Sequence, residues 1–224
     1  MAAWKMIYLA RRNPALAAED FPQAWREHSA LGRQCRNVQD KVTGVAQCSR
    51  ILDAGDALAG VSTDYDGVNV LDLRDRQAAD DIWNDAETLA IMRPDEPRVF
   101  STYVRDFTLV TAEESLRAGE VCDVALFIFL RPQAGARLRV DGQALAAADG
   151  FAQAGRLLLN HVDGDCPPGY EYSHIIAAWY AGVEPLRAAF SGREVWSCLP
   201  AALRADLDLT GSVAMLTRVT HRRP

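Results

Sequence analysis

The segment of residues 5–32 constrains the fold most, because its pattern changes from that of a strand to that of a helix. Residues 6–10 are apolar and β-prone, and Asn13-Pro14 ends the strand, since proline fixes φ and keeps the residue before it out of the helical region. Glu19-Asp20 then supplies the negative charge that suits the first turn of a helix. The segment therefore predicts a strand, a turn and a helix over residues 18–31.

One side of this predicted helix carries a histidine among apolar residues. Phe21, Trp25, His28 and Gly32 are spaced by four, three and four residues, so they share one stripe. A histidine in such a stripe either packs in the core or takes part in proton chemistry. The pattern leaves both interpretations open for His28.

The whole chain shows the order strand, helix, strand, strand, helix, strand twice. Strands are expected at residues 5–10, 43–52, 65–73 and 102–111, and again at 121–130, 157–162, 172–180 and 212–220. Helices are expected at 18–31, 76–84 and 88–92 in the first half and at 144–154, 183–191 and 199–205 in the second, with residues 111–120 as a linker holding one short helix. This rhythm predicts an internal duplication into two units, residues 1–112 and 120–224.

Each predicted unit has the β-α-β-β-α-β order of a ferredoxin-like α+β fold. Its four-stranded antiparallel sheet has helices on one face, and the other apolar face needs cover, since exposing it costs about 25 cal/mol per Å². We therefore expect the two sheets to close an α+β barrel within one chain. A barrel of this kind is expected to enclose an apolar cavity for a small ligand.

The opening segment resembles that of the EthD family, within the dimeric α+β barrel superfamily. Its matching residues are Arg11, Arg12, Pro14, Leu16, Phe21, Trp25 and His28. Trp25 and His28 lie three apart where the family has four, and Ser29-Ala30 replaces Gly-Pro. Further matches are residues 65–68, where Gly67 suits a bend or a close backbone approach, residues 92–100, and Asn160-His161-Val162-Asp163 in the second half. The resemblance implies a protein that handles small molecules, since the superfamily includes cyclases, dehydratases, decarboxylases, isomerases and cofactor-independent monooxygenases.

Composition limits the class of protein. The 224 residues are 49% hydrophobic with a net charge of −6, which argues against nucleic acid and anionic membranes as partners. No window approaches the ~18 apolar residues of a membrane span. The five cysteines are widely spaced, which predicts neither a disulfide framework nor a zinc site and fits a cytoplasmic location.

Candidate site residues are the histidines, tyrosines and neighbouring polar or aromatic side chains on the predicted elements. The expected catalytic residues are His28, His161, Tyr65 and Tyr103, and the expected substrate-binding residues are Tyr8, Trp25, Asp66, Tyr172, His174 and Trp179. Histidine suits proton removal next to a carbonyl, and a tyrosine hydroxyl can donate to the resulting enolate. His221 is expected to be solvated in the terminal tail. No metal or cofactor is expected, because the motifs for metals, nucleotides and flavins are missing.

Three functions fit these residues. The first is a cofactor-free lyase or isomerase, of dehydratase, decarboxylase or cyclase type, acting on a small aromatic, polyketide-like or terpenoid molecule. The second is a non-catalytic binding or accessory protein of a catabolic oxygenase system, and the third is a haem-binding barrel. The expected partner is a small hydrophobic or aromatic substrate, and a homodimer remains open.

Overall fold

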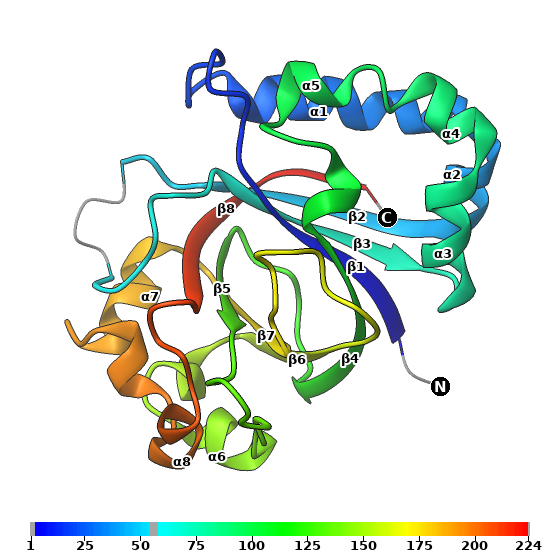
Figure 1. The fold of residues 1–224 in the computed structure, drawn as a ribbon. Helices are drawn as coiled ribbons and strands as arrows, with labels where there is room; N and C mark the ends of the chain where they lie inside the picture. The colour runs from blue at the N-terminus through cyan, green and yellow to red at the C-terminus, as the bar shows by residue number, and fades with distance from the viewer. Residues whose placement is uncertain (1–2, 54–57, 224) are drawn as a thin grey trace.

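Eight strands form a closed barrel (Figure 1), and along each strand the side chains alternate between the interior and the outer face. The computed structural model describes residues 3–53 and 58–223. The strand order around the barrel is β1-β3-β2-β8-β5-β7-β6-β4, and each described neighbouring pair is antiparallel.

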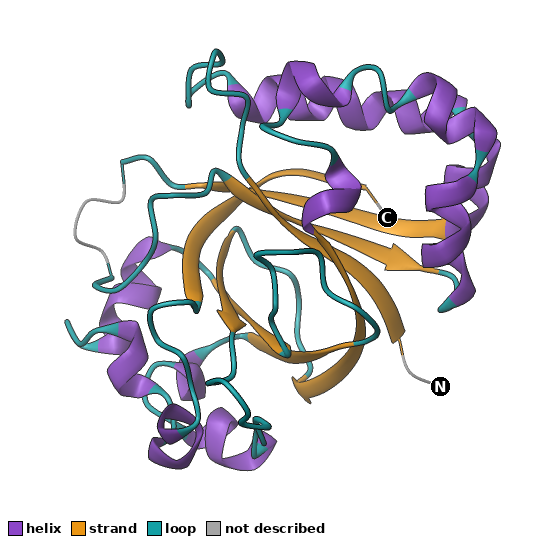
Figure 2. Ribbon diagram, in the orientation of Figure 1, coloured by secondary structure: helices purple, strands orange, loops and turns teal. Residues whose placement is uncertain are grey.

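The first unit supplies four strands and the longest described helix. Its elements are β1 (Ala3–Ala10), α1 (Phe21–Leu31), η1 (Gly32–Gln34), α2 (Arg36–Lys41), β2 (Val42–Arg50), β3 (Gly67–Leu73), α3 (Gln77–Asn84), α4 (Ala86–Ile91), α5 (Glu96–Val99), η2 (Val104–Phe107) and β4 (Thr108–Arg117). Figure 2 shows α1 to α5 as a layer over the outer face of this part of the sheet.

The second unit repeats the arrangement with shorter helices. Its elements are β5 (Val124–Leu130), α6 (Gly142–Ala147), η3 (Phe151–Gln153), β6 (Arg156–Val162), β7 (His174–Tyr180), α7 (Val183–Phe190), η4 (Val195–Cys198), α8 (Ala201–Ala205) and β8 (Val213–Arg223). The two units join through the pairs β2–β8 and β4–β6. The expected α+β barrel of two β-α-β-β-α-β units is thus confirmed.

Three sequence expectations were wrong in detail. The strand expected at 102–111 begins only at Thr108, and the segment expected as a linker at 111–120 continues β4 to Arg117. The polar residues of segment 111–120 did not suggest a strand. However, β4 needs this length to pair with β6, and the paired residues run from Thr111 opposite Val162 to Arg117 opposite Leu157. The helix expected at 144–154 stops at Ala147, and Gly150 then turns the chain at φ +87°.

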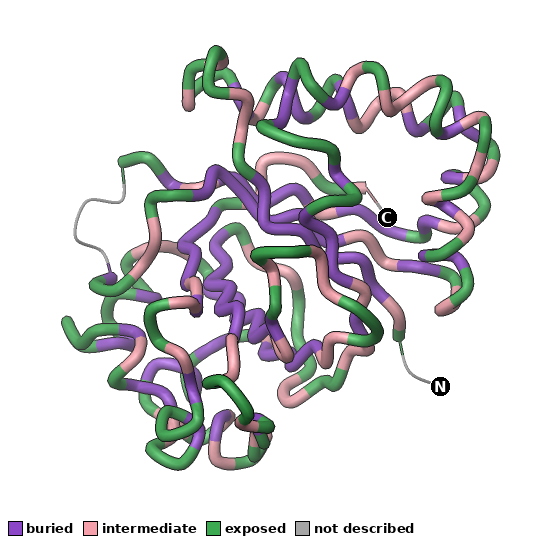
Figure 3. The backbone as a smooth tube through the Cα atoms, viewed as in Figure 1, coloured by how far each residue is buried: buried purple, intermediate pink, exposed green. Residues whose placement is uncertain are grey.

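The two faces of the sheet have different roles. Inward-facing Ile7 and Leu9 pack with residues such as Phe127, Trp179 and Met215, so the barrel interior is filled by side chains. The space found among the central side chains measures about 10 Å³, close to the limit for one water molecule. The expectation of a ligand cavity at the centre of the barrel was therefore wrong, and the larger space among inward-facing side chains is a cleft of about 170 Å³ at one end. Figure 3 shows the strands as the most continuously buried part of the chain.

The outward faces hold the helices of each unit. Met6 and Tyr8 face the helices of the first unit, and Leu157, Ile176 and others face those of the second. None of the helices in the described part of the chain is both long and apolar enough to cross a membrane.

Candidate functional site

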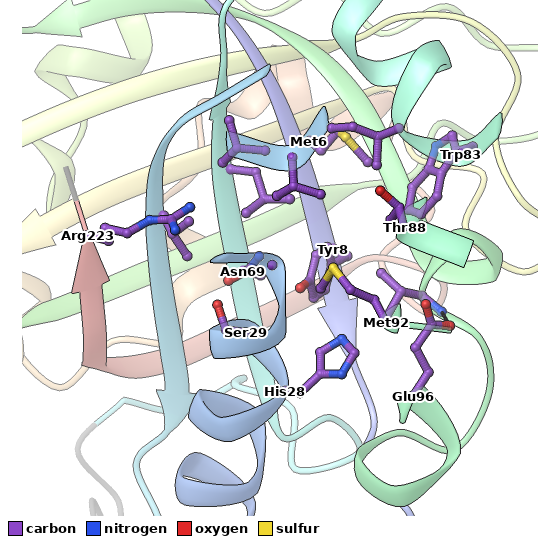
Figure 4. Close-up of a pocket in the computed structure, with 17 residues that line it drawn as sticks. Met6, Tyr8, His28, Ser29, Asn69, Trp83, Thr88, Met92, Glu96 and Arg223 are labelled. Atoms are coloured by element: carbon purple, nitrogen blue, oxygen red, sulfur yellow. Dashed lines mark hydrogen bonds between the residues drawn. The ribbon is translucent and has the colours of Figure 1, made fainter. Parts of the chain in front are cut away.

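A cavity of about 80 Å³ lies between the helices of the first unit and the outer face of its sheet (Figure 4). Its apolar lining residues are Met6, Val38, Val42, Val45, Leu71, Ile82, Trp83, Met92 and Val104. Its polar lining residues are Tyr8, His28, Ser29, Asn69, Thr88, Glu96 and Arg223. Mostly apolar walls with a few polar groups are typical of sites for small organic molecules.

His28 reaches this cavity from α1 and is held in one orientation. Its side chain is only 4% exposed, and the edge of its ring meets Phe100 at a centroid distance of 5.4 Å. Nδ1 lies 3.0 Å from Oδ2 of Asp95. Because a carboxylate only accepts, the ring places a proton on Nδ1 and keeps the lone pair on Nε2.

Asp95 is itself fixed by a second contact. The Arg98 guanidinium donates to both carboxylate oxygens, from Nε at 2.7 Å and from an Nη atom at 3.1 Å. Arg98, and to a smaller extent His28, holds the pKa of Asp95 below its ordinary value. Burial lowers the pKa of His28, and the contact with Asp95 offsets this only in part. The neutral imidazole is therefore the stable form at neutral pH, as a general base requires.

Tyr8 and Asn69 present polar groups from the sheet. They lie opposite each other in the β1–β3 register, and Figure 4 shows both on the side of the sheet that faces His28. Oδ1 of Asn69 is buried and has no hydrogen-bond partner among the described residues. Burial raises the pKa of Tyr8 well above its ordinary value, so its hydroxyl keeps its proton and can donate it in a hydrogen bond.

Glu96 closes one side of the cavity. Its Oε2 accepts a hydrogen bond from the backbone N–H of Val104 at 2.9 Å, and the Nε of Arg93 lies 4.0 Å away. Burial raises the pKa of Glu96 above the usual range of a carboxyl group. The residue therefore offers a second titratable group within the same cavity.

Trp25 and Asp66, two of the expected substrate-binding residues, make packing contacts and ion pairs outside this cavity. Trp25 is fully buried beside Phe21, at a ring centroid distance of 5.0 Å, and beside Tyr8 at 6.1 Å. Asp66 binds Arg12 at 3.0 Å and Arg50 at 3.4 Å. Neither lines the cavity.

The other predicted site tyrosines lie elsewhere. Tyr103 is 41% exposed and lies beneath the guanidinium of Arg93 at 4.0 Å. Tyr65 stacks with Arg11 at 4.1 Å, before β3 begins. Tyr172 packs on Phe129 at 5.3 Å, just before β7.

His161 and His174 lie together on the second unit, away from His28. Their rings are 5.0 Å apart, and Nε2 of His161 lies 2.8 Å from Oε2 of Glu114. They line an open cleft of about 450 Å³. Burial, then the neighbouring His161, lowers the pKa of His174 to about 4.

His221 is not in a solvated tail as expected. It belongs to β8, where it pairs with Gln47 of β2. Its side chain is half-buried. The pattern HRRP suggested a charged end, but residues 221–223 extend the strand that joins the two units.

Sequence reasoning missed Asp95, Asn69 and Glu96 as site residues. Asp95 and Glu96 lie in the segment 92–100 that resembles the EthD family, so a signal for them existed. Asn69 is an isolated polar residue in a strand, and its position shows only in the β1–β3 register.

Among the described residues, no group of three or more His, Cys, Asp or Glu side chains is arranged to hold a metal ion.

Comparison with known proteins supports the fold. No protein-family model matches the chain, and no curated protein is similar to it in sequence. Among solved structures, an anthrone oxidase-like protein matches with a TM-score of 0.60 at 10% identity, over 99% of this chain and 92% of that one. A candidate monooxygenase from Fusobacterium nucleatum subsp. nucleatum matches with a TM-score of 0.55 at 6% identity, over 99% and 94%.

A chlorite dismutase mutant from Candidatus Nitrospira defluvii, in complex with cyanide, matches with a TM-score of 0.51 at 12% identity, over 99% of this chain and 91% of that one. Each of the three chains is matched over nine tenths of its length or more, so the similarity covers both units of the barrel. At these identities the comparison shows the α+β barrel fold.

Proposed function

We propose that the cavity beneath α1 is the active site of a cofactor-free enzyme that removes a proton from a small apolar or aromatic molecule. The observation that carries the proposal is the His28–Asp95 pair at the edge of an apolar cavity. Asp95 fixes the tautomer that leaves Nε2 as the base, and burial keeps the imidazole neutral.

Tyr8 and Asn69, on the sheet, supply the polar groups that would hydrogen-bond to the substrate. When Nε2 of His28 takes a proton from carbon next to a carbonyl, negative charge moves to the carbonyl oxygen. The Tyr8 hydroxyl then donates to that oxygen, in an apolar site where such a hydrogen bond is strong. Oδ1 of Asn69 lacks a partner and can accept from a substrate hydroxyl.

The size of the cavity limits the substrate. About 80 Å³ is smaller than the ~150 Å³ that holds one benzene ring. Met6 and Met92 line the space, and their unbranched thioether chains can change rotamer at low cost. With that rearrangement the site would admit a substrate with one ring or a comparably small terpenoid, and larger molecules would need further opening of the cavity.

The same enolate leads to two reaction classes. Returning the proton elsewhere, or expelling a leaving group, gives the isomerase or lyase chemistry that the sequence favours. The anthrone oxidase-like and monooxygenase neighbours favour a second candidate, in which dioxygen oxidises the enolate. A methylene would then become a carbonyl with one oxygen atom of O₂, and the other atom would leave as water.

The EthD resemblance belongs to this proposal. Phe21, Trp25 and His28 fall in α1, and Asp95 falls in the second matching segment. We propose that the chain is a distant member of that family, with the two segments brought together at one cavity.

A haem does not fit this cavity, whose 80 Å³ is well below the ~300–1,000 Å³ of pockets for drug-sized molecules. The cleft beside His161 is larger, but Nε2 of His161 is already held by Glu114 at 2.8 Å. No step of the proposed reaction involves haem.

Hydrogen–deuterium exchange tests the common first step. Single-ring and fused-ring ketones and phenols would be incubated with the protein in D₂O, and exchange at acidic C–H positions followed by NMR. We expect exchange with at least one compound, and a fall of about 10²–10⁴-fold for His28→Gln. His161→Gln is the matched control and should retain the activity.

The outcomes separate the alternatives. Exchange that survives in His28→Gln but is lost in His161→Gln would move the site to the second unit. Binding without exchange by any compound would support a carrier or accessory protein instead. An oxygen electrode then distinguishes oxidation, which consumes O₂, from lyase or isomerase chemistry, which does not.

A further inference from the structure

Cationic side chains and buried polar side chains gather at one open end of the barrel, where β1 begins and β8 ends (Figure 1). A cleft of about 170 Å³ opens there, between the starts of β2 and β6 and the ends of β3, β7 and β8. It is separate from the cavity of His28, which lies outside the barrel under the helices, although Val45 and Arg223 contact both.

Positive charge gathers around this end. Lys5 projects inward in register with Ile7, is almost fully buried, and binds Asp72 at 3.1 Å and Glu113 at 2.6 Å. Arg156 lies 3.8 Å from the same Glu113. Arg222 and Arg223 line the cleft without an ion-pair partner within the described residues.

These charges do not cancel. The cleft has four cationic side chains, Lys5, Arg156, Arg222 and Arg223, and two carboxylates, Asp72 and Glu113. This leaves two positive charges in excess, although the net charge of the whole chain is −6. A local excess of this sign attracts anions.

Buried polar atoms at the same end lack partners. Nε1 of Trp179 and Oδ1 of Asn160 have none among the described residues. Both side chains line the space of about 10 Å³ among the central side chains, which shares four lining residues with the cleft. Trp179 also lines the cleft itself, and it is only 3% exposed. Buried polar atoms in folded proteins almost always have a partner, so an indole N–H in this position points to a bound acceptor.

We propose that the barrel mouth binds a small organic carboxylate with an apolar body. The carboxylate lies among Lys5, Arg156 and Arg222 and accepts from Nε1 of Trp179. The body of the ligand packs against Val70, Leu158 and the Trp179 ring. The cleft volume of about 170 Å³ exceeds the ~150 Å³ that admits one benzene ring, so an acid with a single ring fits.

Titration with benzoate tests this site on the full chain. ¹H–¹⁵N spectra resolve the indole N–H of each tryptophan, and the signal that disappears in Trp179→Phe identifies the relevant one. We expect benzoate to shift this signal in a saturable way, and the neutral isostere benzamide to bind at least about tenfold more weakly.

Charge variants locate the carboxylate. Arg156→Gln and Arg222→Gln should each weaken benzoate binding by about tenfold, which is the effect of losing one charge-assisted hydrogen bond. Arg204→Gln is the matched control, because Arg204 is exposed on α8 outside the cleft. His28→Gln should leave the benzoate affinity unchanged, which separates this site from the proposed active site.

Three results would overturn the proposal. One is the lack of a saturable shift at millimolar benzoate in a protein that is folded by circular dichroism. Another is equal affinity for benzoate and benzamide. The third is a shift of the Trp83 signal that is lost in His28→Gln, since this would place benzoate in the other cavity.

Discussion

Nδ1 of His28 lies 3.0 Å from Oδ2 of Asp95, although the two residues are 67 positions apart in the chain. The first belongs to α1, and the second precedes α5. Both elements lie on the outer face of one sheet, so the pair exists only because the unit folds (Figure 1). In the neutral imidazole, this contact places the proton on Nδ1 and leaves Nε2 as the free nitrogen.

The titration of His28 should show the influence of Asp95. Burial lowers the pKa of His28 below the ordinary value of 6.5, while Asp95 raises it. NMR titration of the imidazole protons should therefore give a midpoint below 6.5 in the wild type and a still lower one in Asp95→Asn. Asp81→Asn is the control, because Asp81 lies near Lys41 instead. A midpoint that rises in Asp95→Asn would contradict the assignment.

Removing the Tyr8 hydroxyl should affect turnover more than binding. Tyr8→Phe keeps the ring packing against Trp25 and Phe107 but loses the donor to the enolate oxygen. We expect kcat for the exchange reaction to fall by about 10²–10³-fold, with a small change in KM. Tyr103→Phe, on the exposed surface, provides the comparison. Equal activity in wild type and Tyr8→Phe would remove Tyr8 from the reaction.

Acid should destabilise the fold through His174. Its pKa is about 4 in the folded protein and about 6.5 when unfolded, so the unfolded state binds the proton more tightly between these values. The free energy of unfolding should therefore fall as pH decreases from 6.5 to 4, and His28 acts in the same direction. Urea unfolding at several pH values should show a shallower decline for His174→Gln. Parallel curves for the two proteins would argue against a buried neutral His174.

Gly67 should tolerate no side chain. A Cβ atom there would come within 2.6 Å of the Trp25 ring and 2.9 Å of the Cys48 carbonyl oxygen. Gly67→Ala should lower the free energy of unfolding by about 1–3 kcal/mol, because both neighbours are fully buried. Gly155→Ala is the matched control, since its nearest described neighbour would be 3.7 Å away. Thermal unfolding of the two variants gives the comparison, and equal melting temperatures would contradict the packing at Gly67.

Local sequence patterns identified much of the fold. The repeated rhythm of strands and helices in both halves, together with the resemblance of the opening segment, predicted an α+β barrel within one chain. The acidic residues expected in the first turn of α1 lie just before it, because the helix begins at Phe21. Gly67 was expected to allow a close approach, and the Trp25 ring occupies that space. These features depend on neighbours in the sequence or on alternation along one strand, which a sequence displays directly.

The candidate site depended on contacts that the sequence does not display. His28 stood out as a histidine in an apolar stripe, but nothing local distinguished it from His161, and the register alone placed Asn69 opposite Tyr8. The ends of β4 and β8 read as a polar linker and a charged tail, yet both are strands because they close the barrel between the units. The sequence by itself determined the order of elements, since local patterns specify them. Only the tertiary structure decided that the barrel interior is filled and that the cavity lies beneath α1, because packing volumes depend on side chains far apart in the chain.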